Sequence, residues 1–95
     1  MDTIKTTNFF GVLIRKDSIA RKGHKVSDIK GIIETTLLDE NDDLLSYGPC
    51  FGEEAADNLA KKLEGKGLEY VDDYYIFQGD FPEWLSFKVG FVKSE

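Results

Sequence analysis

GEEAADNLAKKLEGKG, residues 52–67, predicts one amphipathic helix, and the chain predicts strands on both sides of it. Two glutamates near its start and two lysines near its end match the helix dipole, and the glycines at its end are typical of a helix stop. The apolar face consists of Ala55, Ala56, Leu59, Ala60 and Leu63. Since most of these side chains are small, we expect the helix to pack closely on a sheet.

The chain before this helix predicts three strands. FFGVLIRK, residues 9–16, and IKGIIETTLL, residues 29–38, are rich in β-branched and aromatic residues, which favours strands. The basic segment 17–28 lies between them and predicts a loop. DENDD, residues 39–43, is typical of a turn, and residues 44–48 predict a third strand that completes a hairpin.

The chain after the helix predicts two further strands, residues 68–77 and residues 84–92, joined by a loop at 78–83. In the last strand, apolar residues alternate along one face: Leu85, Phe87, Val89 and Phe91. The order β-β-β-α-β-β predicts an α+β fold, an antiparallel sheet of four to five strands with one helix packed on one face. The other face of this sheet has no second helix to cover it.

The strand at residues 68–77 contains adjacent polar and aromatic pairs, so its orientation has to be chosen. We place Val71, Tyr75 and Phe77 towards the helix. The outward set is Tyr70, Asp72, Tyr74 and, on the next strand, Trp84. The reverse orientation stays open, because it buries Ile76 better.

The composition indicates a single small acidic globular domain, residues 1–95, of which 41 % are hydrophobic. The net charge of −6 divides unevenly: residues 1–30 carry seven basic and three acidic side chains, and residues 31–95 carry five and fifteen. A lone cysteine forms no internal disulfide. The start of the chain lacks the features of a signal peptide, and no apolar run approaches the length of a membrane span. We therefore expect a cytoplasmic protein with no membrane partner.

Metal and enzyme chemistry find little support in the sequence. Asp39, Asn41 and Asp43 match the start of an EF-hand loop, but the loop then has Leu44 where glycine is needed and Cys50 where glutamate is needed. One histidine and one cysteine cannot build a structural zinc site or hold a catalytic pair in a defined geometry. We expect no catalytic residue, no metal and no cofactor, and hence no enzyme.

Residues 70–87 combine aromatic and acidic side chains and contain no basic residue between Tyr70 and Phe87. Aromatic side chains are enriched at protein interfaces, and acids favour a basic partner. We expect a protein-binding module, of the inhibitor, immunity-protein or antagonist type, which binds a basic protein surface. The expected contact residues are Tyr70, Asp72, Tyr74, Asp80, Glu83 and Trp84. The plain alternative is that the aromatic residues fill the core.

The second interpretation is that the protein mimics a nucleic acid rather than binding one. The basic segment 15–25 lacks neighbouring aromatic residues for base stacking, and the rest of the chain would repel phosphate, so we expect no direct nucleic-acid contact. We instead expect the acids of residues 34–57 to imitate the phosphates of a nucleic acid. The protein would then occupy the binding site of a DNA- or RNA-binding protein. The core of this acidic surface is Asp39, Glu40, Asp42 and Asp43.

SYGPCFGEEAADNLAKKLEGKGLEY, residues 46–70, combines a strand, a Gly-Pro turn, an Ala/Leu helix and a Gly-Leu turn. This stretch, about a quarter of the chain, is similar to one half of the SPOR peptidoglycan-binding domain. The resemblance implies a glycan binder as a further alternative, although the second strand–helix unit of that family is absent. Finally, an exposed edge strand, residues 9–16 or 84–92, is a possible site for pairing two copies into a homodimer.

Overall fold

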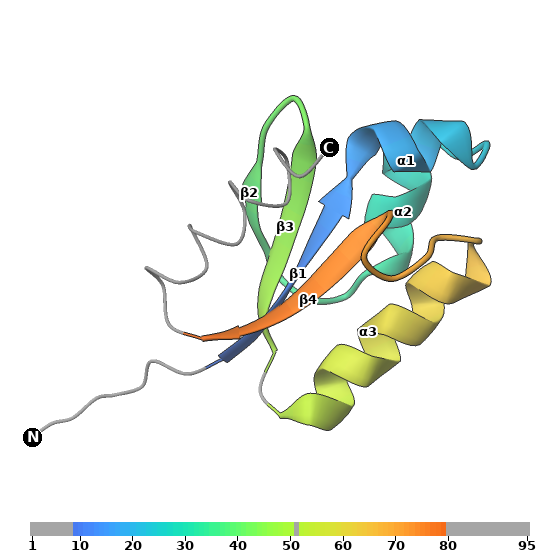
Figure 1. The fold of residues 1–95 in the computed structure, drawn as a ribbon. Helices are drawn as coiled ribbons and strands as arrows, with labels where there is room; N and C mark the ends of the chain where they lie inside the picture. Colours follow the sequence, from blue (N-terminus) through green and yellow to red (C-terminus); the bar gives the residue numbers. More distant parts are fainter. Residues whose placement is uncertain (1–8, 51, 80–95) are drawn as a thin grey trace, which may run out of the picture.

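The computed structural model describes residues 9–50 and 52–79. They form a four-stranded antiparallel sheet with the strand order β2-β3-β1-β4 and three helices (Figure 1). The strands are β1 (Phe9–Arg15), β2 (Leu37–Glu40), β3 (Leu44–Cys50) and β4 (Tyr74–Gly79), and the helices are α1 (Lys16–Arg21), α2 (Val26–Ile32) and α3 (Glu53–Gly65). The predicted fold class, an antiparallel α+β sheet with a helix packed on one face, is confirmed.

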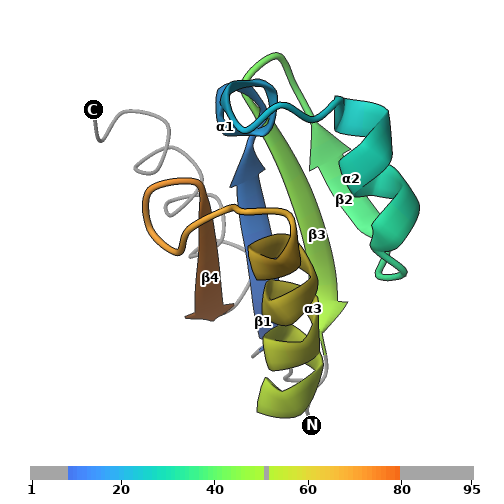
Figure 2. The same cartoon turned by 90° about the vertical axis from the view of Figure 1, so that its right-hand side faces the viewer.

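All three helices lie on one face of the sheet, as Figure 2 shows. Alternate residues of the strands point to this face, as the pleat of a sheet requires. Val12 and Ile14 of β1, Leu45 of β3 and Tyr74 of β4 are buried there together with apolar residues of the helices. The helix contribution comes from Ile19, Ile29, Ala56, Leu59, Ala60 and Leu63.

The opposite face of the sheet carries a second, smaller buried cluster, formed by Leu13, Leu44 and Phe77. Gly11 pairs with Phe77 across β1 and β4, and a Cβ atom on Gly11 would lie only 2.3 Å from Cζ of the Phe77 ring. The glycine therefore makes room for the ring to lie flat against the strand. At these positions both faces of the sheet are therefore buried, instead of one buried face and one face exposed to solvent.

Helix α3 agrees with the predicted helix in extent but not in its full apolar face. Ala56, Leu59, Ala60 and Leu63 are buried, as predicted, but Ala55 is exposed. The buried stripe is therefore narrower than predicted. Because two of its four members are alanines, α3 approaches the sheet closely.

Residues 16–32 correct the sequence prediction, because a loop and the first four residues of a strand were expected there and two short helices are found. Gly23, with φ +86°, adopts the left-handed conformation that ends α1. The Asp28 carboxylate accepts a hydrogen bond from the amide of Lys25 at 3.1 Å and so caps the start of α2. Ile29 and Ile33, four residues apart, are both buried by this helical turn. Their β-branched side chains favoured a strand locally, but burial against the sheet decides the outcome.

The hairpin between β2 and β3 follows the prediction more closely, although β2 covers only the last two residues of the predicted strand 29–38 and extends to Glu40. The Asn41 side chain accepts hydrogen bonds from the amides of Asp43, at 2.7 Å, and Leu44, at 2.8 Å. This is the local turn chemistry that the run of Asp and Asn predicts.

Strand β4 begins at Tyr74, so the first six residues of the predicted strand 68–77 lie before it and end in a turn at residues 71–73. The predicted orientation is wrong: Tyr74 is 1 % exposed and faces the helices, whereas Val71 is 54 % exposed. Phe77 is buried, but on the opposite face. The backbone turn at residues 70–73 resets the alternation, which the sequence pattern does not reveal.

The edges of the described sheet also differ from the prediction. Strand β1, expected as a possible edge, pairs with β3 on one side and β4 on the other. Within residues 9–50 and 52–79 the outer strands are β2 and β4. The predicted strand 84–92, and any homodimer contact through it, lie outside the described residues. Among the described helices, none has the length and apolar character to cross a membrane.

Candidate binding groove between α3 and β4

A groove of about 380 Å³ opens between α3 and β4 on the helix face of the sheet. Helix α3 packs against β1 and β3, which leaves this space beside β4. The wall formed by α3 consists of Glu53, Ala56, Asp57, Ala60 and Glu64. The other wall and the floor consist of Phe10, Tyr70, Tyr74 and Ile76. As far as the described residues line it, the groove thus has an apolar, aromatic interior and acids along its α3 side only.

The three acids of the α3 wall, which we call the acidic rim, are Glu53, Asp57 and Glu64. They follow one another at intervals of four and seven residues and therefore lie along one side of the helix. All three are exposed, and no basic residue of the described chain forms an ion pair with them. The rim presents negative charge to the solvent at the mouth of the groove.

The aromatic wall is built around Tyr70, which is 48 % exposed. Its ring stacks on Tyr75, with the ring centres 5.7 Å apart and the planes 7° apart. It also meets Tyr74 edge to face, with the ring centres 5.5 Å apart. These two contacts fix the ring of Tyr70, so the wall offers a pre-organised apolar surface.

Tyr74 connects the two walls of the groove. Its hydroxyl donates a hydrogen bond to Oε2 of Glu64 at 2.9 Å. Burial, followed by this hydrogen bond to a negative group, raises the pKa of Tyr74 well above its usual value. The hydroxyl therefore remains a donor at physiological pH, and it orients the Glu64 carboxylate at the end of the rim.

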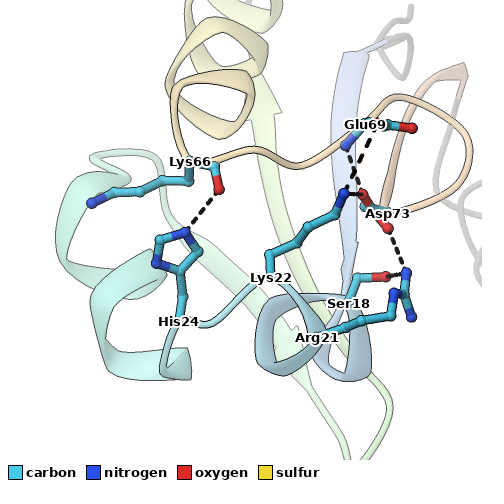
Figure 3. Close-up of polar contacts among 7 residues, drawn as sticks. All are labelled: Ser18, Arg21, Lys22, His24, Lys66, Glu69 and Asp73. Atoms are coloured by element: carbon cyan, nitrogen blue, oxygen red, sulfur yellow. Dashed lines mark hydrogen bonds and ion pairs between the residues drawn. The ribbon is translucent and has the colours of Figure 1, made fainter.

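The turn that carries Tyr70 is held by a cluster around the buried side chain of Asp73 (Figure 3). Asp73 Oδ1 lies 2.8 Å from Nη2 of Arg21, and Oδ2 lies 3.7 Å from Nζ of Lys22. The amide of Glu69 donates to Oδ2 at 2.8 Å. Arg21 also donates to the hydroxyl of Ser18 at 3.0 Å. We call these five residues the Asp73 cluster; it joins α1 to the turn before β4.

The charge state of Asp73 follows from these contacts. Burial alone would raise the pKa of this carboxyl group. Hydrogen bonds from the Glu69 amide and the Ser18 hydroxyl, together with the charges of Lys22 and Arg21, outweigh burial, so the pKa of Asp73 lies below its usual value. Asp73 is therefore ionised at neutral pH and compensated within the cluster.

Val71, at the tip of the same turn, has a backbone φ of +77°, and it is the one residue other than glycine with positive φ among those described. A β-branched side chain is strained in this region of the backbone map. The amide of Val71 donates to the carbonyl of Tyr74 at 2.6 Å, which closes the turn around the strained residue. The Asp73 cluster and this short bond together hold a conformation that the sequence alone disfavours.

The core of the predicted phosphate-like surface, Asp39 to Asp43, lies elsewhere, at the β2–β3 hairpin, whereas Glu53 and Asp57 of the predicted stretch 34–57 belong to the acidic rim. Glu40 forms ion pairs with Lys16 at 2.9 Å and with Lys30 at 2.6 Å, and these hydrogen bonds, Lys30 first, lower the pKa of Glu40. Asp39 is half-buried, whereas Asp42 and Asp43 are exposed in the turn. Part of the negative charge predicted for this surface is therefore compensated by neighbouring lysines.

The predicted contact residues are only partly brought together. Tyr70 lies at the groove, and Asp72 is exposed in the adjoining turn. Tyr74 lines the groove but is almost wholly buried, which contradicts its predicted outward position. Asp80, Glu83 and Trp84 lie outside the described residues. Glu53 and Asp57 were included in the predicted acidic stretch 34–57, but Glu64 and the meeting of these acids with Tyr70 were not predicted. The spacing of the three acids around Ala56 and Ala60 is the signal that could have indicated a groove.

Cys50 and His24, the candidates for nucleophilic chemistry, both occupy positions that stabilise the fold. Cys50 is buried at the end of β3, and burial raises the pKa of its thiol. His24 donates through Nε2 to the carbonyl oxygen of Lys66 at 2.8 Å, which ties the loop after α1 to the end of α3 (Figure 3). The described residues contain no group of three or more side chains suited to bind a metal ion.

Comparison of the chain with protein-family models, with curated proteins and with solved structures finds no match. The resemblance of residues 46–70 to half of a SPOR domain therefore has no support from a family model, although the strand–turn–helix unit itself is present as β3 and α3. Function has to be argued from the groove and its surroundings.

Proposed function

We propose that the protein is a binding module that holds a basic segment of a partner protein in the groove between α3 and β4. The observation that carries the proposal is the combination of an apolar, aromatic groove with an acidic rim that has no basic neighbour in ion-pair contact within the described chain. Such a module acts by covering a basic surface of its partner, as an inhibitor or antagonist does.

The energetics of the rim support this proposal. Glu53 and Asp57 are four residues apart on one helix, and like charges at this spacing cost an isolated helix about 0.2–0.5 kcal/mol. A basic ligand relieves this repulsion and is also attracted from a distance by the negative field of the rim. The exposed ring of Tyr70 adds an apolar surface against which aliphatic side chains of the ligand can pack.

The proposal is tested by selecting ligands with the full chain immobilised and a display library of random peptides. We expect the enriched peptides to contain lysine or arginine together with large apolar residues. Neutralising the rim, by Glu53→Gln, Asp57→Asn and Glu64→Gln together, is expected to weaken their binding roughly tenfold or more.

The matched control removes the same number of charges from the hairpin, by Asp39→Asn, Asp42→Asn and Asp43→Asn. This control changes the net charge equally, so it is expected to change affinity by no more than about twofold at physiological salt, where charges beyond about 8 Å are screened. The proposal is wrong if the hairpin variant loses binding and the rim variant keeps it. In that case the acidic hairpin, as in the mimic interpretation, is the binding surface.

A further inference from the structure

We infer that the segment held in the groove is an amphipathic α-helix that lies along α3 and carries basic residues on one flank only. The inference rests on the proposed function, and it adds the conformation and the residue pattern of the ligand. It follows from the spacing of the acidic rim and from the difference between the two walls.

The spacing of the rim matches a helix. At a rise of about 1.5 Å per residue, the four residues from Glu53 to Asp57 span about 6 Å, and the seven residues from Asp57 to Glu64 span about 10.5 Å. A helix lying beside α3 repeats the same rise, so basic residues at positions i, i+4 and i+11 meet all three acids. These positions fall on one side of the ligand helix, as they do on α3.

An extended ligand does not fit the same spacing. At about 3.3 Å per residue, 6 Å corresponds to two residues of a strand, which point to the same side. However, about 10.5 Å corresponds to three residues, and the third points to the opposite side. A strand could therefore pair with Glu53 and Asp57, but its next basic side chain would point away from Glu64.

The two walls differ in chemistry, and this fixes the pattern of the ligand. The described residues on the β4 side are Phe10, Tyr70, Tyr74 and Ile76, which carry no charge. The ligand flank that faces them is therefore expected to be apolar. Between the flanks, Ala56 and Ala60 leave the space into which large apolar side chains of the ligand can insert, as in other helix-in-groove complexes.

The test uses synthetic peptides of about 18 residues, long enough to form several helical turns. The first has leucines on one face and lysines at i, i+4 and i+11. The second has the same composition, but its lysines stand on the opposite flank of the leucine face. The third equals the first except for a central proline, which breaks the helix. Fluorescence anisotropy gives the dissociation constants for the full chain, and circular dichroism reports helix formation on binding.

We expect the first peptide to bind about tenfold more tightly than either of the others and to gain helicity when bound. If the proline peptide binds as tightly as the first, the helix inference is wrong, whereas the proposed function survives. If the second binds as tightly as the first, the one-flank pattern is wrong. If no peptide responds to neutralisation of the acidic rim, the proposed function itself fails.

Two protein variants place the ligand in the groove. Ala60→Leu fills the space beside Ile76, and we expect it to weaken binding of the first peptide at least tenfold. Ala55→Leu adds the same side chain to the exposed side of the same helix and is expected to leave binding unchanged. Equal affinity of both variants would overturn the assignment.

If Ala60→Leu impairs folding, the position of the ligand can still be tested by exchanging the charges of Asp57 and of the ligand residue that pairs with it. Asp57 is exposed, so Asp57→Lys is expected to fold. This variant should bind the first peptide weakly and recover affinity for a version in which the lysine at i+4 is replaced by glutamate. Absence of this recovery would contradict the register that we propose.

Discussion

Asp73 and Asp57 carry the same side chain, yet the molecule uses them in opposite ways. Asp73 is buried at the turn before β4, where an arginine, a lysine and a backbone amide compensate its charge. Asp57 is exposed on α3, and no described basic residue pairs with it. The charge of Asp73 is compensated within the chain, and the charge of Asp57 is one that we propose a partner compensates.

This difference separates acids that hold the fold from acids that are available for binding. The Asp73 cluster fixes the turn at residues 70–73, and this turn places Tyr70 at the groove. In the acidic rim, Asp57 forms no ion pair within the described chain and is repelled by Glu53, whereas Glu64 also accepts the hydrogen bond of Tyr74. The variants below should therefore divide into one group that loses stability and another that loses binding.

The largest effect is expected from Asp73→Ala. It removes the charge-assisted hydrogen bonds to Arg21 and to the Glu69 amide, which are typically worth about 1.5–3 kcal/mol each before relaxation. Because the Arg21 side chain is 56 % exposed and can regain water, we expect a net loss of about 2–3 kcal/mol in the free energy of unfolding. Urea denaturation measures it. The neighbouring exposed residue provides the control: Asp72→Ala should change stability by less than about 0.5 kcal/mol.

The pH dependence of stability should show part of the same contribution. The pKa of Asp73 is lower in the folded than in the unfolded chain, so its contribution is fully present above the unfolded value of about 3.9. It is lost as the pH falls below that value and through the folded pKa. Urea midpoints measured between about pH 6 and pH 2.5 should therefore fall less steeply for Asp73→Asn than for the unchanged protein. Parallel curves would show that Asp73 titrates no differently in the folded chain.

A smaller effect, of the opposite sign, is expected from Val71→Gly. The substitution relieves the positive φ of Val71, and this gain exceeds the entropy that glycine adds to the unfolded chain. We expect the protein to become more stable by about 0.5–1 kcal/mol, measured by thermal unfolding. Asp72→Gly, at a position without positive φ, should destabilise instead; a loss of stability in both variants would argue against strain at Val71.

The smallest effect on stability is expected from Asp57→Asn. An exposed acid without an ion-pair partner among the described residues should change the free energy of unfolding by less than about 0.5 kcal/mol, and a slight gain is expected from the relief of repulsion with Glu53. The same variant should weaken binding of the lysine-containing helical peptide severalfold. A large loss of stability with unchanged binding would show that Asp57 holds the fold and does not take part in binding.

Helix α3 was predictable from sequence because its apolar periodicity is strong over the whole element. Strand β1 was predictable from its short run of apolar, β-branched and aromatic residues, and β3 from the turn that precedes it. Residues 16–32 were not predictable, because α1 and α2 have only six and seven residues and form through burial of Ile19 and Ile29 against the sheet. Isolated helices of this length are unstable, so local propensity carries little information about them. Their capping signals, Gly23 and Asp28, were present in the sequence but outweighed by the β-branched residues around them.

The groove could be predicted only in its parts. The aromatic side chains near residue 70 and the acids of the helix are visible in the sequence. Their meeting depends on how far α3 is displaced from β4 and on the turn at residues 70–73, which reverses the expected orientation of Tyr74. Both are properties of tertiary packing, and neither leaves a periodic pattern.

The most direct test of the central claim is a map of amide chemical shifts in the full chain on titration with the lysine-containing helical peptide. We expect the largest changes on the two walls of the groove, at Ala56, Ala60, Tyr70 and Ile76, and little change at residues 39–43. Shifts concentrated at residues 39–43, with the groove unaffected, would contradict this claim and assign binding to the acidic hairpin.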